Sequence, residues 1–317
     1  MTQHYVFVMD PVSAVLVNED TSFALMLEAQ NRGHHVSHCL PQDLYLREGR
    51  LFARTAPATM QRVASMPIVL GDHEDLCLHD VDAVFVRKDP PFDSNYLYCT
   101  LMLEHLMGET LVVNRPSGLR AANEKLYTCH FPELMPATLV SNSKARIAAF
   151  VHDIGGKAVI KPLDGAGGEG VMALLEGDLN FNAIVEATTR HGQRVAMVQA
   201  FLPEVSQGDK RILLLDGEPL GAILRVPQGG DMRSNIHVGG QVERATIDDA
   251  DHRIIEAIAP RLIEDGLFFV GLDVIGGRLT EVNVTSPTCF QEISQQTDCD
   301  VAALFMDALE RNTSREH

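Results

Sequence analysis

The chain has 317 residues, of which 45% are hydrophobic and 22% charged, with a formal net charge of −17 at pH 7. These proportions are those of a globular protein, and the length predicts two or three subdomains. The negative charge argues against nucleic acid or an anionic membrane as a partner. A phosphate site would therefore have to be a local basic pocket.

The six cysteines are scattered and form no Cys-x-x-Cys pair. This pattern favours reduced thiols over a disulfide framework or a zinc site. The N-terminus lacks a basic region followed by an apolar signal core, and no run of about eighteen apolar residues occurs. We therefore expect a cytoplasmic protein.

The first part of the chain alternates predicted strands and helices. Strands are expected at 5–9, 36–40, 83–86 and 111–113, and helices at 20–32 and around 95–107. This alternation predicts a parallel, Rossmann-like sheet in an α/β domain over residues 1–122. Asp10 follows the first strand, where ligand crevices form in such sheets.

The second part, residues 123–317, has strand pairs with fewer helices, which predicts an α+β arrangement. Strands are expected at 171–175, 195–201, 211–215 and 220–226, and a helix at 250–265. An Asp-Gly turn at 216–217 joins two of these strands into a predicted hairpin.

Residues 159–171 read VIKPLDGAGGEGV. An apolar strand delivers Lys161 and ends at Pro162, and glycines follow whose backbone N–H groups can wrap an anion. The segment matches G-x-G-x-x-G but opens no helix, and the chain contains no Walker-type loop. We interpret it as a flexible flap over phosphates; a plain hairpin is the alternative.

Residues 271–284 read GLDVIGGRLTEVNV, which predicts two strands joined by a glycine turn. A three-residue turn with Ile275 opposite Leu279 would put Asp273 opposite Glu281, on the face shared by Asn283. These oxygen ligands suit Mg²⁺ held between protein and phosphates. A two-residue Gly-Gly turn would separate Asp273 from the others. An amphipathic hairpin without a metal is the alternative.

In the segment 123–127, Asn123 is a predicted helix cap and Lys125 lies in the first helical turn. A lysine there opposes the helix dipole at a small cost, which a solvated surface tolerates. Lys125 therefore gains meaning only in combination with the other segments.

Taken together, these segments resemble the bacterial-type glutathione synthetases, a family of the ATP-grasp superfamily. The resemblance covers nearly the whole chain. It rests on the segments Val8–Pro11, Arg87–Asp93, Asn123–Leu126, Lys161–Gly165, Gly208–Arg211, Pro227–Gly230, Gly271–Asp273 and Thr280–Thr288.

The resemblance implies an ATP-grasp fold with the N-terminal domain on the peptide-substrate side. A central lid subdomain (123–202) and a C-terminal catalytic subdomain (203–317) with a mobile loop at 227–241 would follow. The implied reaction joins γ-glutamylcysteine to glycine through an acyl phosphate, with ATP and Mg²⁺ or Mn²⁺. The implied assembly is a homo-oligomer, a tetramer by family resemblance.

The resemblance also implies residue roles. Metal ligands would be Asp273, Glu281 and Asn283. Nucleotide contacts would come from Lys125, Lys161, Gly165, Gly167, Gly168, Gln199, Ala200, Phe201, Leu202, Asp209, Arg211 and Asn283. The catalytic set would be Arg225, Arg233 and Lys161. Peptide contacts would come from Asp10, Arg87, Asp89, Ser286, Pro287 and Thr288, with Ser22 and Phe23 as further candidates. No residue is indicated as the base for the amine.

One departure concerns the long loop, where Gly239-Gly240 is followed by Gln241 in place of the family's usual arginine. Two other functions therefore stay open. One is an ATP-grasp ligase with a different donor or acceptor. The other is a nucleotide-binding regulator, or a dinucleotide-dependent oxidoreductase that carries the glycine pattern.

Overall fold

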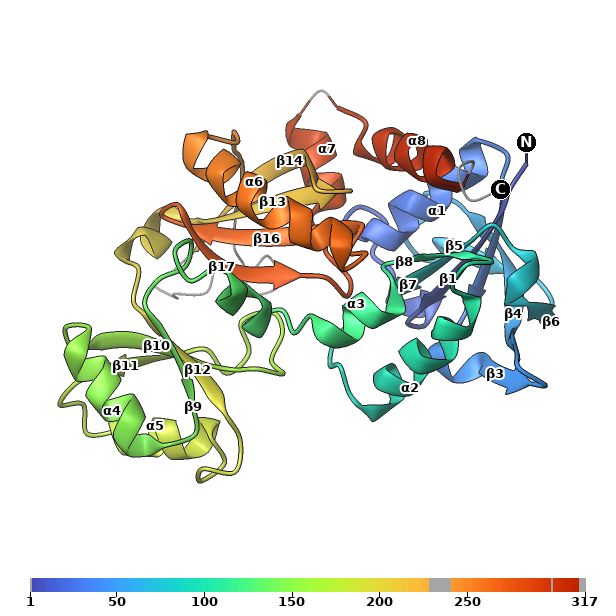
Figure 1. Cartoon of the computed structure of the whole chain (residues 1–317). Helices are drawn as coiled ribbons and strands as arrows, with labels where there is room; N and C mark the ends of the chain where they lie inside the picture. Colours follow the sequence, from blue (N-terminus) through green and yellow to red (C-terminus); the bar gives the residue numbers. More distant parts are fainter. Residues whose placement is uncertain (1, 228–240, 298, 314–317) are drawn as a thin grey trace.

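The computed structural model describes residues 2–227, 241–297 and 299–313, which contain three β-sheets (Figure 1). Within these ranges no helix combines the length and apolar character that crossing a bilayer requires. Arg233 and most of the predicted loop at 227–241 lie outside the described residues.

The N-terminal sheet has eight strands, β1 to β8. Their bounds are His4–Met9, His35–Cys39, Leu44–Arg47, Arg50–Met60, Ile68–Leu70, Glu74–Cys77, Ala83–Arg87 and Leu111–Val113. Helices α1 (Thr21–Asn31), α2 (Ser94–Leu103) and α3 (Pro116–Ala121) accompany them.

Strands β2, β1, β7 and β8 are parallel neighbours, as the alternating pattern predicted. Residues Tyr5 to Met9 of β1 are all buried, because both faces of this part of the sheet are covered. Strands β3 to β6, in contrast, pair antiparallel. This extension was not predicted, because β3, β5 and β6 have four residues or fewer and the 11-residue β4 contains no continuous apolar run.

The central sheet has four strands in the order β11-β10-β12-β9. They span Met172–Leu175, Lys157–Pro162, Ala196–Ala200 and Thr138–Ser141, with helices α4 (Lys144–Asp153) and α5 (Phe181–Thr188) packed against them. The predicted strand at 171–175 and the strand that delivers Lys161 are thereby confirmed as an antiparallel pair.

The third sheet has five antiparallel strands in the order β15-β14-β13-β16-β17. They span Gln241–Arg244, Glu218–Val226, Asp209–Leu215, Phe269–Ile275 and Arg278–Asn283. Helix α6 (Asp249–Glu264) begins at a capping box of Asp248 and Asp251. Helices α7 (Phe290–Gln296) and α8 (Val301–Thr313) follow the sheet, and α8 lies beside α1 (Figure 1).

The hydrophobic cores group the sheets in two bodies. Val6 of β1 and Leu272 of β16 belong to one core, and Phe7 and Phe269 belong to a second. The central sheet has a separate core that includes Ile160. The N-terminal and five-stranded sheets therefore pack together, whereas the central sheet stands beside them, at the lower left of Figure 1.

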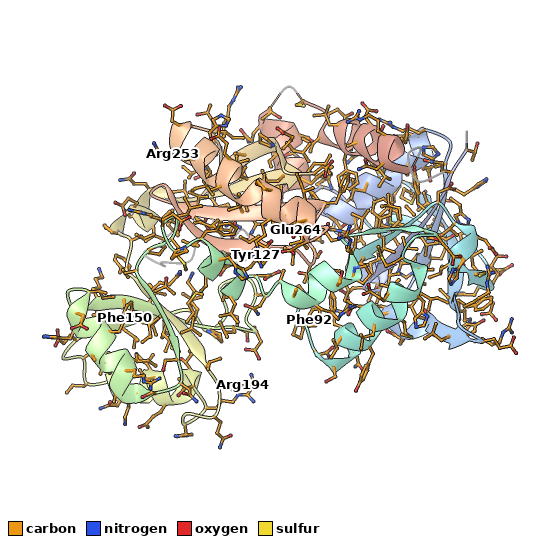
Figure 2. The ribbon with its side chains drawn as sticks, viewed as in Figure 1. Phe92, Tyr127, Phe150, Arg194, Arg253 and Glu264 are labelled. Carbon is orange, nitrogen blue, oxygen red and sulfur yellow. The ribbon has the colours of Figure 1, made fainter. Side chains whose placement is uncertain are left out.

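Asn114 links the first and third sheets. Its buried side chain accepts from the N–H of Phe269 (2.7 Å) and donates to the carbonyls of Phe269 and Val284 (2.8 Å each). The Tyr127 hydroxyl donates to Asp265 (2.8 Å), which follows the Glu264 labelled with Tyr127 in Figure 2, and so ties the segment after α3 to the end of α6. The Asn114 bonds hold the start of β16 and the end of β17 in a fixed position relative to β8.

Candidate active site

The hairpin β16–β17 has a two-residue turn. Gly276 and Gly277 both have positive φ, and Ile275 pairs with Arg278. The predicted three-residue turn, with Ile275 opposite Leu279, is therefore wrong. The strands nevertheless pair Asp273 with Glu281, because Thr280 is the extra residue of a β-bulge.

The bulge places Asp273 opposite Glu281, as the three-residue turn was expected to do. It returns Asp273, Glu281 and Asn283 to one face, and Asn283 Nδ2 lies 3.3 Å from Asp273 Oδ2. The Thr280 hydroxyl donates to the Asp273 carbonyl (3.0 Å), and this bond holds the bulged residue in place. A bulge leaves no clear signature in an alternating pattern, so register could not be read from sequence alone.

Two arginines surround Asp273. Arg211 holds it with Nε (2.6 Å) and Nη2 (3.0 Å), and Arg225 Nη2 lies 2.9 Å from the same carboxylate. The cause is cross-strand register, since Arg211 pairs with Asp273 and Arg225 pairs with Asp209. Burial alone would raise the pKa of Asp273, but the charges of Arg211 and Arg225 hold it well below its usual range.

Asp209, one of the predicted nucleotide contacts, forms an ion pair with Arg225 (2.5 Å). Burial raises the pKa of Asp209 despite this pairing, and the negative charge of Asp273 acts in the same direction. Asp209 therefore belongs to the charged cluster around Asp273 and Arg225.

The ammonium groups of Lys125 and Lys161 lie 3.6 and 3.9 Å from Oε1 of Glu281. Burial lowers the pKa of Lys161, and Glu281 partly offsets this effect. Lys125 differs from the prediction. It precedes a 3-10 helix at Leu126–His130, is only 3% exposed, and donates to the Gly165 carbonyl (2.6 Å). It is a buried site residue rather than a solvated one.

A cavity of about 160 Å³ lies between the central and five-stranded sheets. It contains the arginines and acids described above. All predicted nucleotide contacts except Lys125 and Gly165 line it, namely Lys161, Gly167, Gly168, Gln199, Ala200, Phe201, Leu202, Asp209, Arg211 and Asn283. The turn between β10 and β11 borders the cavity, and its glycines 167, 168 and 170 have positive φ, as expected for a backbone that wraps an anion.

A second cavity, also about 160 Å³, lies where β1 and β7 end. The predicted peptide contacts meet there: Asp10, Arg87, Asp89, Ser286 and Thr288 line it. Pro287 contributes its carbonyl, which accepts from Arg87 Nη2 (3.0 Å), while Arg87 Nε donates to Ser22 (3.0 Å). Parallel strands that end at one edge explain this convergence.

Several residues of the site were missed. Glu19, Asp20, Thr21, Cys289 and Glu292 line the second cavity, although no motif indicated them. They come from the start of α1 and from α7, far apart in sequence. No local pattern brings these segments together; tertiary packing does.

Glu124 was also missed. Its buried carboxylate accepts from the Thr285 hydroxyl (2.9 Å), and its carbonyl accepts from the N–H of Val282 in β17 (2.9 Å). Burial raises the pKa of Glu124, and the negative charge of Glu281 adds to this effect. Glu124 therefore extends the charged cluster toward the N-terminal sheet.

The chemistry of the hairpin suits Mg²⁺ or Mn²⁺. No group of three His, Cys, Asp or Glu side chains able to hold a metal occurs in the described ranges. Asp273, Glu281 and Asn283 offer instead two carboxylates and one amide. A magnesium ion that keeps part of its hydration and also binds phosphates needs no larger protein ligand set.

Solved structures with the same architecture include an ATP-grasp ligase. A D-cycloserine synthetase, DcsG, matches with a TM-score of 0.68 at 16% identity, over 99% of this chain and 100% of its own. The ATP-grasp ligase PsnB, in complex with a precursor peptide and AMPPNP, matches with a TM-score of 0.62 at 15% identity over 99% of both chains. The fold is thus the ATP-grasp fold.

Sequence relatives define the family. Residues 4–120 match the N-terminal domain of prokaryotic glutathione synthetase, and residues 124–298 match its ATP-grasp domain. Glutathione synthetase of Vibrio cholerae is 45% identical over 96% of both chains. That of Salmonella typhimurium is 43% identical over 97% of this chain and 98% of its own. The chain belongs to the prokaryotic glutathione synthetase family.

Proposed function

We propose that this protein is a glutathione synthetase, which uses ATP to join the cysteinyl carboxylate of γ-glutamylcysteine to the amino group of glycine. The observation that carries the proposal is the charged cluster that lines the first cavity. Asp273 and Glu281 lie opposite each other there, within reach of Lys125, Lys161, Arg211 and Arg225. Such a set positions phosphates beside a second, carboxylate-bearing substrate.

The reaction has two steps. A carboxylate is a poor electrophile, so its oxygen first attacks the γ-phosphorus of ATP, which releases ADP and gives an acyl phosphate. The glycine amine then attacks the acyl carbon, and inorganic phosphate leaves with the C–O electron pair. Proteins assist phosphoryl transfer chiefly by positioning and by stabilising charge. Arginine forks suit the transferred group because they stay charged and match phosphate oxygens.

Asp273, Glu281 and Asn283 would hold Mg²⁺ or Mn²⁺, which supplies neutralisation of phosphate charge when bound. Lys161 would contact the phosphates directly. Lys125 would hold the glycine flap in place through Gly165. The backbone of Gln199–Leu202 would contact adenine, since these four residues line the first cavity.

The donor peptide would occupy the second cavity, with its reacting carboxylate directed toward Arg211 and Arg225. In this proposal residues 1–122 bind the donor, residues 123–202 supply the flap, and residues 203–317 supply the metal ligands. A cytoplasmic, homo-oligomeric enzyme completes the proposal. Arg233 stays a predicted catalytic residue.

A substrate panel tests the proposal. ADP and phosphate release would be measured with γ-glutamylcysteine and glycine, with each omitted in turn, and with γ-glutamylalanine or simple dipeptides as donors. We expect release to depend on both γ-glutamylcysteine and glycine, one phosphate per glutathione. Faster turnover of another donor or acceptor would favour the altered-specificity ligase. Saturable NADPH binding without ATP turnover would favour the oxidoreductase.

A further inference from the structure

The second cavity carries a strong excess of negative charge. Five carboxylates line it, from Asp10, Glu19, Asp20, Asp89 and Glu292, whereas Arg87 is the one cationic lining residue in the described chain. Two of the acids have other partners. Lys88 pairs with Asp10 (3.0 Å), and Asp20 caps α1 by accepting from the N–H of Phe23 (2.7 Å). Such a lining favours a cationic group of the ligand.

Two buried polar atoms in this cavity lack a partner. Thr21 is 1% exposed, and neither its Oγ1 nor Glu292 Oε2 has a hydrogen bond to any described residue. A buried polar atom left unpaired costs on the order of 1–3 kcal/mol. Folded proteins seldom leave such atoms unpaired, and those that occur need a physical reason. A ligand that donates hydrogen bonds to both oxygens would satisfy them.

We propose that Glu292 and Thr21 bind the α-ammonium group of the γ-glutamyl end of the donor peptide. An ammonium has three N–H donors and no acceptor, so it can satisfy the carboxylate and the hydroxyl together. The inference rests on the proposed function, in which the donor is γ-glutamylcysteine. The single ammonium group of this peptide is at the end opposite the reacting cysteinyl carboxylate. Glu292 and Thr21 thereby set the direction in which the donor lies.

The geometry between the cavities agrees with this direction. Arg211 Nη1 and Pro287 Cβ each lie 3.2 Å from the position that a Cβ on Gly271 would occupy. Pro287 is flanked by Ser286 and Thr288, which line the second cavity, and Arg211 lines the first. Gly271 therefore lies close to Arg211 of the first cavity and to the segment 286–288 that borders the second. A donor anchored at Glu292 would extend past this segment toward Arg211.

A donor lacking the amino group tests the contact. Wild type, Glu292→Gln and an exposed-carboxylate control, Glu256→Gln, would be assayed with γ-glutamylcysteine and with N-glutarylcysteine, which lacks only that group. For γ-glutamylcysteine we expect Glu292→Gln to lower kcat/KM by about 10²-fold, mostly through KM, because a buried charged partner is lost. For N-glutarylcysteine, already poor with wild type, the substitution should change kcat/KM less than about threefold, since the contact is absent.

Thr21→Val supplies a second variant with a structural readout. It replaces an unpaired buried hydroxyl by a methyl of the same shape, so the unliganded protein should melt at a higher temperature. Calorimetric affinity for γ-glutamylcysteine, measured with a non-hydrolysable ATP analogue, should fall about tenfold. Affinity for N-glutarylcysteine should not change.

The outcomes separate the two proposals. If wild type makes no product from γ-glutamylcysteine and glycine, the proposed function fails. If wild type makes glutathione but Glu292→Gln and Thr21→Val bind and use the donor normally, the ammonium assignment is overturned. An equal loss with both donors also overturns it, because the effect then does not depend on the amino group. Glu256→Gln should match wild type in every assay.

Discussion

Asp273 lies directly opposite Glu281 across a hairpin whose turn has only two residues, because Thr280 bulges out of the pairing. The bulge brings both carboxylates to the face that also carries Arg211 and Arg225. On this face, strand register sets two of the charged contacts: Arg211 pairs with Asp273, and Arg225 pairs with Asp209. The cluster therefore depends on backbone pairing as much as on side-chain identity.

The first prediction concerns Glu281→Gln. It removes the carboxylate that faces both lysines, so the proposed metal loses one charged ligand. We expect turnover to fall by at least ~10²-fold with the fold intact, as for other single electrostatic stabilisers. The Mg²⁺ concentration needed for half-maximal rate should rise. By calorimetry, ATP without metal should bind this variant at least as tightly as it binds wild type, because Lys125 and Lys161 no longer have the Glu281 carboxylate as a competing anion.

The matched control is Glu218→Gln, an exposed carboxylate at the start of β14 in the same sheet. Its turnover and Mg²⁺ dependence should equal those of wild type. Near-normal turnover of the Glu281 variant would show that the hairpin face is not the reaction centre.

The second prediction separates the two lysines. Lys161→Met should weaken Mg·ATP binding by about tenfold or more, because Lys161 lines the proposed nucleotide cavity and its side chain is only 12% exposed. Lys125→Met should weaken binding less, since the Lys125 ammonium donates to the flap carbonyl of Gly165. Exposed Lys144, paired with Glu186 on α5, supplies the control Lys144→Met. Fluorescence titration with Mg·ATP measures all three, and unchanged affinity in the Lys161 variant would contradict the phosphate assignment.

Much of this site could be predicted because its residues sit in local patterns. The glycine segment, the strand that delivers Lys161 and the existence of the β16–β17 hairpin all follow from alternation and turn residues. Local patterns fail where one added residue changes register, and Thr280 is such a case. They fail again where a helix cap such as Asp20 meets a later helix carrying Glu292, since only the tertiary fold brings these segments together.

The same limit explains the misread environment of Lys125. A lysine one residue before a short helix reads as solvated, yet its ammonium lies buried between Gly165 and Glu281. Burial of a lysine is rare unless it is paired, and no periodic pattern signals it. The antiparallel strands β3 to β6 were missed for a related reason, because β5 and β6 are short and largely exposed at the sheet edge.

The third prediction concerns the flap. Gly170 has a φ of +71°, and a Cβ there would lie 2.9 Å from Pro162 Cγ. Gly170→Ala therefore combines backbone strain of about 1–3 kcal/mol with a contact against the end of β10. We expect Mg·ATP affinity to fall by about tenfold, because the turn must shift to relieve the contact. Gly177→Ala is the control: its φ is +80°, but no atom lies within 4 Å of its added Cβ.

Titrating both variants with Mg·ATP separates strain at the flap from strain in general. Gly177→Ala should lose a little thermal stability and keep its nucleotide affinity. An equal loss of affinity in the two variants, or none in Gly170→Ala, would mean that the flap does not contact phosphate.

The last prediction concerns Asn114, which joins the N-terminal sheet to the hairpin of β16 and β17. Asn114→Ala leaves the N–H of Phe269 and the carbonyls of Phe269 and Val284 without their buried partner. Each such loss costs on the order of 1–3 kcal/mol, so we expect a loss of about 3 kcal/mol or more in the free energy of unfolding. Asn114→Asp should be at least as damaging, because it keeps the acceptor but sets a buried charge against two carbonyl oxygens. Urea unfolding followed by circular dichroism measures both.

Asn142→Ala, which removes an exposed bond to the Gly192 carbonyl, should cost less than about 1 kcal/mol. A similarly small cost for Asn114→Ala would show that the two sheets hold together through their shared cores alone.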